Sequence, residues 1–402
     1  MSQTSKPTLH LLKINLMDTT FTPSAQQITQ TKQKIDAYIQ SIDANPEHRS
    51  GAYPYYQFHA EGEAIRGTVL MFHGFSSKPH QMWRLTDYLF RNGFNVYQAT
   101  LAGHAFRIPD KYWPQVDLKP EIANPLREKV QQDPVLLNFF ANLMADPSNY
   151  GRLGELEKKA LVARLVKLEP RLLNIVKAIE LNEDPDFDRY FISSHMNYLQ
   201  NARDRLAELE AMPGPIYTIG LSVGGSVALG LAADRPDRIK GVVAYAPLLK
   251  IYGVQERQYV MLAGPLDISE SGWDPALQFP VGCLTAVDCF GSFVLSKVQT
   301  LQSVPTFLVL TENEDAADIE TNQQFFKDIG GERKKHRLYV YPSSDMVPHP
   351  MVDPTEISRQ MSNRFWQSLY QETFRFLTAG EVDSANMANV DQNTDLPQVP
   401  PV

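Results

Sequence analysis

A serine between two glycines is the first group in this sequence that could do chemistry. Ser222 lies in the stretch Ile216–Gly225, which reads IYTIGLSVGG. An apolar, β-prone run precedes Ser222 and small residues favouring a helix follow it, so the pattern predicts a strand, a tight turn and a helix. Serine on such a corner can act as a nucleophile, and Gly220 and Gly224 leave room for its strained backbone.

A second motif follows an earlier apolar run. His73-Gly74-Phe75 comes directly after 67–72, whose continuous hydrophobic pattern is typical of a buried parallel strand. A helix is expected over 79–92, then a strand over 94–99 closed by a Gly-His pair at His104. The segment 53–60 and the turn after it suggest a β-hairpin with the 67–72 strand.

Together these motifs resemble the α/β-hydrolase superfamily, most nearly its monoacylglycerol-lipase-like and esterase branch. The resemblance covers roughly 53–378, apart from two insertions. It implies an α/β fold with a mostly parallel eight-stranded sheet, helices on both faces and a helical cap inserted between strands. Its motifs are specific for the fold and much less so for the substrate.

The resemblance also implies an oxyanion hole. In this family, the backbone N–H groups after His-Gly and after the nucleophile hold the negative oxygen of the tetrahedral intermediate. The matching residues here are Phe75 and Val223. His73 and His104 precede the serine, the wrong side for the family's base, and are interpreted as structural.

The family order of serine, acid and histidine assigns the base to His349, in the loop after the last expected strand, 337–341. The acid should follow the strand 304–310. An ungapped count gives Glu314, but Thr311 stands where the family usually has glycine, so Asp315 beside it stays open. Asp318 is a third alternative. An amphipathic helix is expected over 354–377, and His336 is interpreted as a surface residue.

The excess length lies in two insertions. Leucine, isoleucine and valine recur at three- and four-residue steps between 153 and 181, which predicts amphipathic helices. The expected organisation is an N-terminal extension with a helix (1–50), a hydrolase core (51–104 and 193–378), a helical cap (105–192), a lid-like excursion within the core (248–303) and a disordered tail (379–402).

Composition limits the partners. The 402 residues are 43% hydrophobic and carry a formal charge of −8, which argues against nucleic acid. The sequence offers no run approaching a membrane span and no secretory leader, so a cytoplasmic location is expected. Cys283 and Cys289 are expected to be buried thiols, although their pairing stays open. We expect no cofactor or metal, and the oligomeric state is open.

These features predict a serine hydrolase of the carboxylesterase or lipase type. The expected reaction cleaves a small-molecule ester with an apolar acyl or alkyl group through an acyl-enzyme intermediate. Alternatives with the same fold are a serine aminopeptidase, an acyltransferase or a C–C bond hydrolase. An aminopeptidase would need carboxylates in the cap, for which Glu155, Glu157, Glu183 and Asp184 are candidates. A relative that binds a ligand without catalysis is the alternative from another class.

Overall fold

The computed structural model describes residues 19–145, 152–180, 186–266, 270–274 and 277–390. Its centre is a seven-stranded sheet in the order β1-β3-β2-β6-β7-β10-β11. All neighbours are parallel except β1, which runs antiparallel to β3. The strands are β1 (Tyr55–Gln57), β2 (Gly67–Phe72), β3 (Phe94–Ala99), β6 (Ile216–Leu221), β7 (Ile239–Tyr245), β10 (Thr306–Thr311) and β11 (Arg337–Tyr341).

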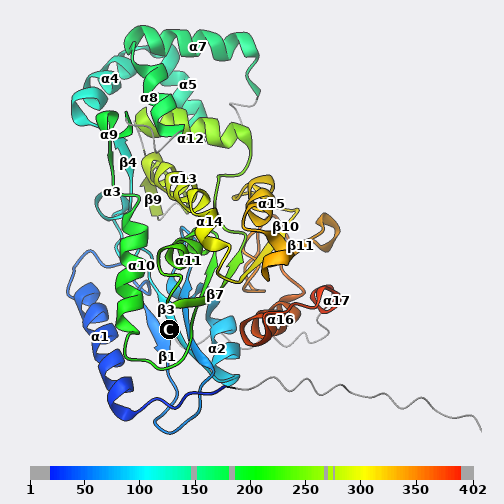
Figure 1. Ribbon diagram of the computed structural model, residues 1–402. Helices are drawn as coiled ribbons and strands as arrows, with labels where there is room; N and C mark the ends of the chain where they lie inside the picture. Colours follow the sequence, from blue (N-terminus) through cyan, green and yellow to red (C-terminus); the bar gives the residue numbers. More distant parts are fainter. Residues whose placement is uncertain (1–18, 146–151, 181–185, 267–269, 275–276, 391–402) are drawn as a thin grey trace, which may run out of the picture.

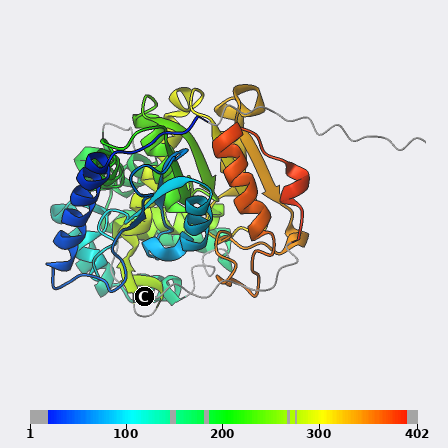
Figure 2. The ribbon, with the colours of Figure 1, turned by 90° about the horizontal axis from the view of Figure 1, so that it is seen from below.

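Helices cover both faces of the sheet, because its central strands are apolar on both sides. The helices α2 (Trp83–Arg91) and α16 (Trp366–Ala379) pack on one face. The other face carries α1 (Ala25–Asp43), α10 (Asn197–Glu208), α11 (Val223–Asp234), α13 (Val281–Ser296), α14 (Val298–Leu301) and α15 (Ile319–Asp328). Figure 2 shows α1 along one side of the molecule and α16 near the other.

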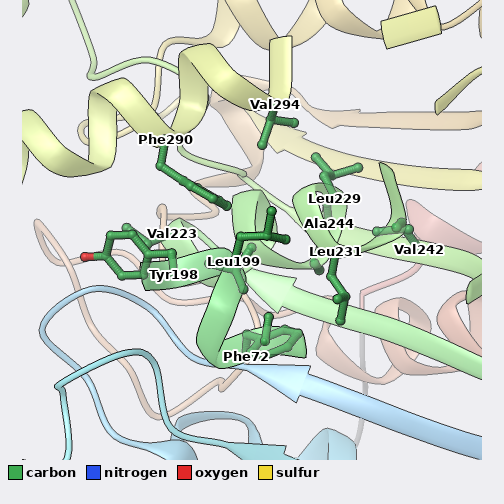
Figure 3. Close-up of a cluster of buried hydrophobic side chains, with 14 of the residues drawn as sticks. Phe72, Tyr198, Leu199, Val223, Leu229, Leu231, Val242, Ala244, Phe290 and Val294 are labelled. Carbon is green, nitrogen blue, oxygen red and sulfur yellow. The ribbon is translucent and has the colours of Figure 1, made fainter. Parts of the chain in front are cut away.

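The core between α10, α11 and α13 lies next to the predicted nucleophile (Figure 3). Phe290 of α13 and Tyr198 of α10 pack with their ring centroids 5.6 Å apart. Val223, the first residue of α11, is fully buried in the same cluster. This packing fixes the start of α11, and with it the turn that carries Ser222.

The two insertions share one hydrophobic core above the sheet (Figure 1). Helix α12 and part of α13, from the excursion predicted at 248–303, pack against the helices of the cap predicted at 105–192. The excursion also contains a hairpin, β8 (Glu270–Asp274) with β9 (Leu277–Pro280). The cap elements are α3 (Pro109–Tyr112), β4 (Val116–Leu118), α4 (Pro120–Gln132), α5 (Pro134–Ala145), α7 (Glu155–Leu168), α8 (Leu172–Glu180), α9 (Phe187–Tyr190) and β5 (Phe191–Ser193), whereas α12 (Val254–Leu266) belongs to the excursion.

The N-terminal half of the sheet differs from the sequence prediction. Among the described residues the central sheet has seven strands, where eight were expected. The predicted hairpin is wrong, since β1 pairs with β3 rather than β2. The pairing of β1 with β3 ends near Asn95, whose side chain accepts a hydrogen bond from the His59 backbone N–H at 2.8 Å.

The C-terminal predictions also need correction. The helix expected over 354–377 begins at Trp366, because Arg359 and Gln360 adopt φ of 48° and 63°, which no right-handed helix accommodates. Residues 379–390 of the predicted disordered tail are ordered, with Met387 fully buried, and 391–402 lie outside the described residues. A further short helix, α17 (Ser384–Met387), packs against α16. His336 is buried rather than exposed.

Candidate active site

Four chain segments that carry the predicted site residues meet at one edge of the sheet. Phe75 follows β2, Ser222 follows β6, Glu314 follows β10 and His349 follows β11. Since these four strands run in the same direction, their carboxyl ends lie along a single edge. The topology therefore brings together residues that are far apart in the sequence.

The Ser222 backbone is strained in the way the motif predicts. Its φ of 58° and ψ of −121° lie in a region that non-glycine residues rarely adopt. Hydrogen bonds hold the corner: the Ser222 N–H donates to the Tyr245 carbonyl at 2.9 Å, and the Leu248 N–H donates to the Ser222 carbonyl at 3.0 Å. Neighbouring strand β7 thus fixes the turn between β6 and α11.

The two glycines of the motif are required by close backbone contacts. A Cβ atom at Gly220 would lie 2.0 Å from the Gly224 carbonyl oxygen. A Cβ atom at Gly224 would lie 2.1 Å from the carbonyl oxygen of Phe72, the last residue of β2. Neither backbone can move without disturbing the sheet, so both positions exclude a side chain.

We therefore expect Gly224→Ala to destabilise the protein by about 3 kcal/mol. Urea denaturation followed by circular dichroism measures this loss. Gly154→Ala is a matched control, because a Cβ atom there would meet its nearest neighbour, Glu157, at an ordinary 3.6 Å. The control should change stability by less than about 1 kcal/mol. Equal effects from the two variants would contradict the packing argument.

His349 and Glu314 are in direct contact. His349 Nδ1 lies 2.5 Å from Glu314 Oε1, and both side chains are almost fully buried. The same Oε1 atom accepts hydrogen bonds from three backbone N–H groups, at 3.1, 3.0 and 3.0 Å, from Asp315, Ala316 and Ala317. The backbone therefore holds the carboxylate that faces the imidazole.

The two alternative acids face other partners. Asp315 Oδ2 lies 3.1 Å from Arg359 Nε. Asp318 caps α15 by accepting hydrogen bonds from the Thr321 backbone and hydroxyl. Of the three candidates, the structure brings Glu314 to His349.

Burial and neighbouring charge act in opposite directions on this pair. Burial lowers the pKa of His349, but the carboxylates of Glu314, Asp315 and Glu356 outweigh it, so its pKa lies above the usual value. Burial raises the pKa of Glu314, but the His349 ring and the backbone N–H donors outweigh it, so its pKa lies below the usual value. Glu314 is therefore a carboxylate at neutral pH.

The turn that carries Glu314, residues 312–318, is braced from two sides. Thr311 donates its hydroxyl hydrogen to the carbonyl of Val347, two residues before His349, at 2.6 Å. On the other side, the Tyr252 N–H donates to the Ala316 carbonyl at 2.7 Å. Thr311, at the position where the sequence comparison led us to expect glycine, thus links the segments of Glu314 and His349.

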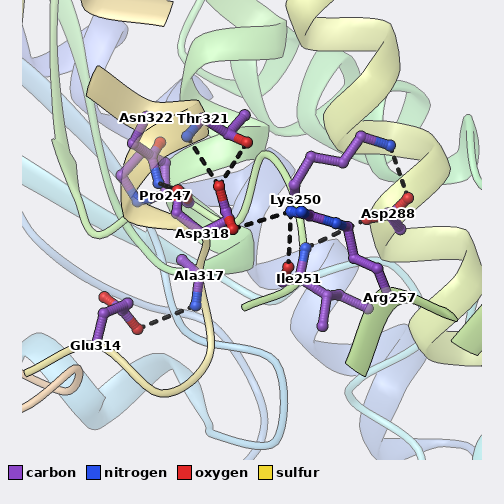
Figure 4. Close-up of polar contacts among 10 residues, drawn as sticks. All are labelled: Pro247, Lys250, Ile251, Arg257, Asp288, Glu314, Ala317, Asp318, Thr321 and Asn322. Carbon is purple, nitrogen blue, oxygen red and sulfur yellow. Dashed lines mark hydrogen bonds and ion pairs between the residues drawn. The ribbon is translucent and has the colours of Figure 1, made fainter. Parts of the chain in front are cut away.

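Side chains from the insertions reach the same turn (Figure 4). Arg257 of α12 lies 3.0 Å from Asp318, and Lys250 lies 2.7 Å from Asp288 of α13. The Asp318 N–H donates to the Lys250 carbonyl at 2.9 Å. The 312–318 turn is therefore attached to α12 directly through Arg257, and to α13 through Lys250.

The segment after β2 is held by buried histidines, as expected of structural residues. The Leu101 N–H donates to His73 Nε2 at 3.2 Å, so the His73 proton is on Nδ1, which donates to the Gly74 carbonyl at 2.7 Å. Burial lowers the pKa of His73 to about 3, so the ring is neutral. His104 stacks on Trp113 with ring centroids 3.7 Å apart.

Ser222 and His349 line the same cleft, which has a volume of about 490 Å³. Its walls combine apolar side chains with the segment after β2. Asp315 and Arg359 lie in its polar wall. The apolar lining residues include Phe75, Leu221, Leu248, Leu284 and Val287. A cleft of this kind suits a substrate with an apolar group beside a polar reacting bond.

Sequence reasoning missed three residues of this site. Gln81 lies in η1 (Pro79–Met82) and contacts the segment after β2. Glu356 contacts Gln81. Arg359 occupies a tight turn, whereas the sequence predicted a helix at this position. None belongs to a motif, and the two left-handed residues at 359 and 360 carry no glycine or asparagine that would signal the turn.

A strained serine between strand and helix, an acid after a later strand and a histidine after the last strand define an α/β-hydrolase fold. No family model matches the chain. A stretch of 62 residues is 42% identical to Lipase LipV of Mycobacterium tuberculosis, covering 14% of this chain and 24% of that protein. This chain thus matches about a quarter of that relative's length.

Solved structures of lipolytic enzymes also resemble this chain. One comes from the metagenome-derived enzymes LipS and LipT, with a TM-score of 0.49 and 13% identity over 82% of this chain and 98% of that one. Another is a monoglyceride lipase of Saccharomyces cerevisiae, with a TM-score of 0.44 and 14% identity over 85% of this chain and 99% of that one.

Two further observations concern metals and membranes. Within the described ranges, no group of three or more histidine, cysteine, aspartate or glutamate side chains could hold a metal ion. Among the same residues, every helix is too short or too polar to cross a bilayer. Cys283 and Cys289 are buried thiols on α13, as expected.

Proposed function

We propose that this protein is a serine hydrolase that cleaves carboxylic esters with an apolar acyl or alkyl group. One observation carries the proposal: Ser222 occupies a strained strand-to-helix corner and shares a cleft with His349, which Glu314 contacts from behind. Lipolytic enzymes and esterases among the similar structures point to the same reaction class.

The proposed first step is acylation. His349 Nε2 accepts the Ser222 hydroxyl proton while the serine oxygen attacks the ester carbonyl, and the Phe75 and Val223 N–H groups hold the oxyanion. The C–O bond to the alcohol then breaks, and His349 returns its proton to the departing oxygen. Glu314 stabilises the imidazolium that exists between these transfers.

Deacylation repeats the sequence with water. His349 takes a proton from water, the resulting oxygen attacks the acyl-serine, and the proton returns to Ser222 as the acid leaves. Val223 is suited to its role because it is the first residue of α11, where N–H groups have no partner within the helix. These steps use groups of the chain itself.

An aminopeptidase gains no support from Glu155, and Glu183 and Asp184 lie outside the described residues. Glu155 lies in a separate groove, between α7 and α12, and contacts Lys158 at 3.4 Å. The apolar wall of the Ser222 cleft instead favours an acyl or alkyl group. We therefore place ester hydrolysis above peptide hydrolysis.

A fluorophosphonate probe tests the proposal. The probe should label the protein at Ser222, identified by peptide mass spectrometry, and the protein should hydrolyse p-nitrophenyl esters. A folded protein that takes no label and cleaves no ester would overturn the enzymatic function and favour a ligand-binding relative. Labelling at another serine would overturn the site.

We expect Leu284→Trp to shift the preference toward short acyl chains. Leu284 and Val287 lie on the same side of α13 and line the cleft, so a larger side chain at 284 removes space for the substrate. The kcat/KM for p-nitrophenyl octanoate should fall about tenfold or more relative to that for acetate. An unchanged ratio would place the acyl group elsewhere. Leu137→Trp, on the exposed face of α5, is the control.

A further inference from the structure

One side chain joins the two sides of the cleft. Gln81 Oε1 accepts a hydrogen bond from the Gly74 backbone N–H at 2.7 Å. Gln81 Nε2 lies 3.1 Å from both carboxylate oxygens of Glu356, seven residues after His349. The amide therefore bridges the segment after β2 and the loop that carries His349.

Both ends of this bridge are anchored. Arg49 donates to the carbonyls of Ser76 and Ser77 at 2.8 and 2.9 Å. At the other end, Asp353 forms an ion pair with Arg84 at 3.2 Å, with both side chains nearly fully buried. Gln81 thus connects two segments that are each attached to the body of the fold.

The bridge acts on the peptide that bears the proposed oxyanion donor. Gly74 is held at its N–H by Gln81 and at its carbonyl by His73. The Gly74–Phe75 peptide is trans, so its N–H points opposite to its carbonyl and away from the His73 ring. The Ser77 N–H also donates to the Gly74 carbonyl, at 3.1 Å. Glycine has the freest backbone of all residues, so these three hydrogen bonds hold the peptide that bears the Phe75 N–H.

We propose that Gln81 is a positioning residue that orients the Phe75 N–H for the oxyanion and ties it to the loop of His349 through Glu356. This inference rests on the proposed ester hydrolysis. Burial raises the pKa of Glu356 to about 7, so its carboxylate depends on nearby donors, and the Gln81 amide supplies them. Gln81 acts through its neighbours and not on the reacting atoms.

Gln81→Leu tests the role by separating kcat from KM. It should lower kcat about tenfold to a hundredfold and change KM less than about threefold, since the oxyanion exists in the transition state and not in the bound ester. The affinity for a trifluoromethyl ketone, which forms an oxyanion on Ser222, should fall in parallel with kcat. Gln302→Leu is the matched control, because its amide donates to the Asp328 carbonyl away from the cleft.

A swapped pair keeps the test decisive if the leucine variant folds poorly. Gln81→Glu alone places two carboxylates together without the amide donor and should lose activity as the leucine variant does. Combining it with Glu356→Gln restores an acceptor for the Gly74 N–H and a donor between the two side chains. The double variant should therefore recover at least tenfold in kcat over Gln81→Glu.

Three results would overturn the inference while the wild type remains active and labelled. They are an unchanged kcat in a folded Gln81→Leu protein, a loss confined to KM, and a double variant no better than Gln81→Glu. An increase in KM with kcat unchanged would mean that Gln81 contacts the substrate. A wild type without labelling or ester cleavage would instead overturn the proposed function, so the two failures are distinguishable.

Discussion

Ser222→Ala is expected to lower kcat for ester hydrolysis by a factor on the order of 10⁴ or more. The variant lacks the oxygen that forms the acyl-enzyme, so what remains is catalysis by binding and the oxyanion donors alone. The fold should survive, because the Ser222 side chain makes no helix-capping hydrogen bond and Ala246 already adopts φ of 40° nearby. Initial rates on p-nitrophenyl butyrate, with thermal unfolding measured beside them, provide the check.

Ser226→Ala is the matched control for this experiment. Ser226 lies one turn further along α11 and is fully buried, so the variant loses the same atom from the same helix without touching the proposed chemistry. It should retain activity within a few fold. If Ser222→Ala kept a tenth of the wild-type rate or more, another group would be the nucleophile.

Glu314 variants are expected to give the second largest effect, and their order is informative. Glu314→Ala removes the group that holds His349 and should lower kcat/KM by a factor on the order of 10⁴. Glu314→Gln should cost less, on the order of 10² to 10³, because three backbone N–H donors still hold an oxygen at the Oε1 position facing Nδ1. The glutamine keeps the ring orientation and loses the charge.

The same glutamine variant should move the acid limb of the pH profile. His349 must be neutral to act as a base, so kcat/KM falls as the pH drops below its pKa. In the wild type this pKa is raised, which places the midpoint above that of an ordinary histidine. Without the Glu314 charge, burial lowers the pKa of His349 with less opposition, so the midpoint should fall. Kinetics between pH 4.5 and about 8.5 measure this shift.

Asp315→Asn separates the two acids that the sequence left open. Its side chain contacts Arg359 and not His349, so the variant should retain kcat/KM within about fivefold. A loss as large as that of Glu314→Gln, or a Glu314→Gln profile with an unmoved midpoint, would contradict the arrangement.

The fold and most of the site could be predicted because their determinants are local in sequence. The motif around Ser222 specifies a corner by its glycines, and the structure shows why: a Cβ atom at Gly220 or Gly224 would collide with backbone atoms. The mostly parallel α/β fold is confirmed. Roles of the individual site residues stay predictions for the experiments above.

What the sequence did not reveal depends on contacts between distant segments. The choice of Glu314 over Asp315 follows from which side chain the turn directs at His349, and that turn is shaped by contacts with Thr311 and Tyr252. The late start of α16 depends on the left-handed backbone of Arg359 and Gln360. The Arg84–Asp353 ion pair, which joins residues 269 positions apart, holds the loop that precedes this helix. No sequence motif pointed to Gln81, because its proposed role depends on two neighbours from different segments.

The attachment of residues 250–252 to the 312–318 turn has a consequence for anyone who wishes to engineer this protein. The antiparallel bridge between Ile251 and Ala317 joins the start of the 248–303 excursion to the turn that carries the carboxylate behind the imidazole. An excursion transplanted from a relative would replace Ile251 and disturb the position of that carboxylate. Chimaeras should therefore be cut beyond Arg257, so that the exchanged piece leaves this bridge intact.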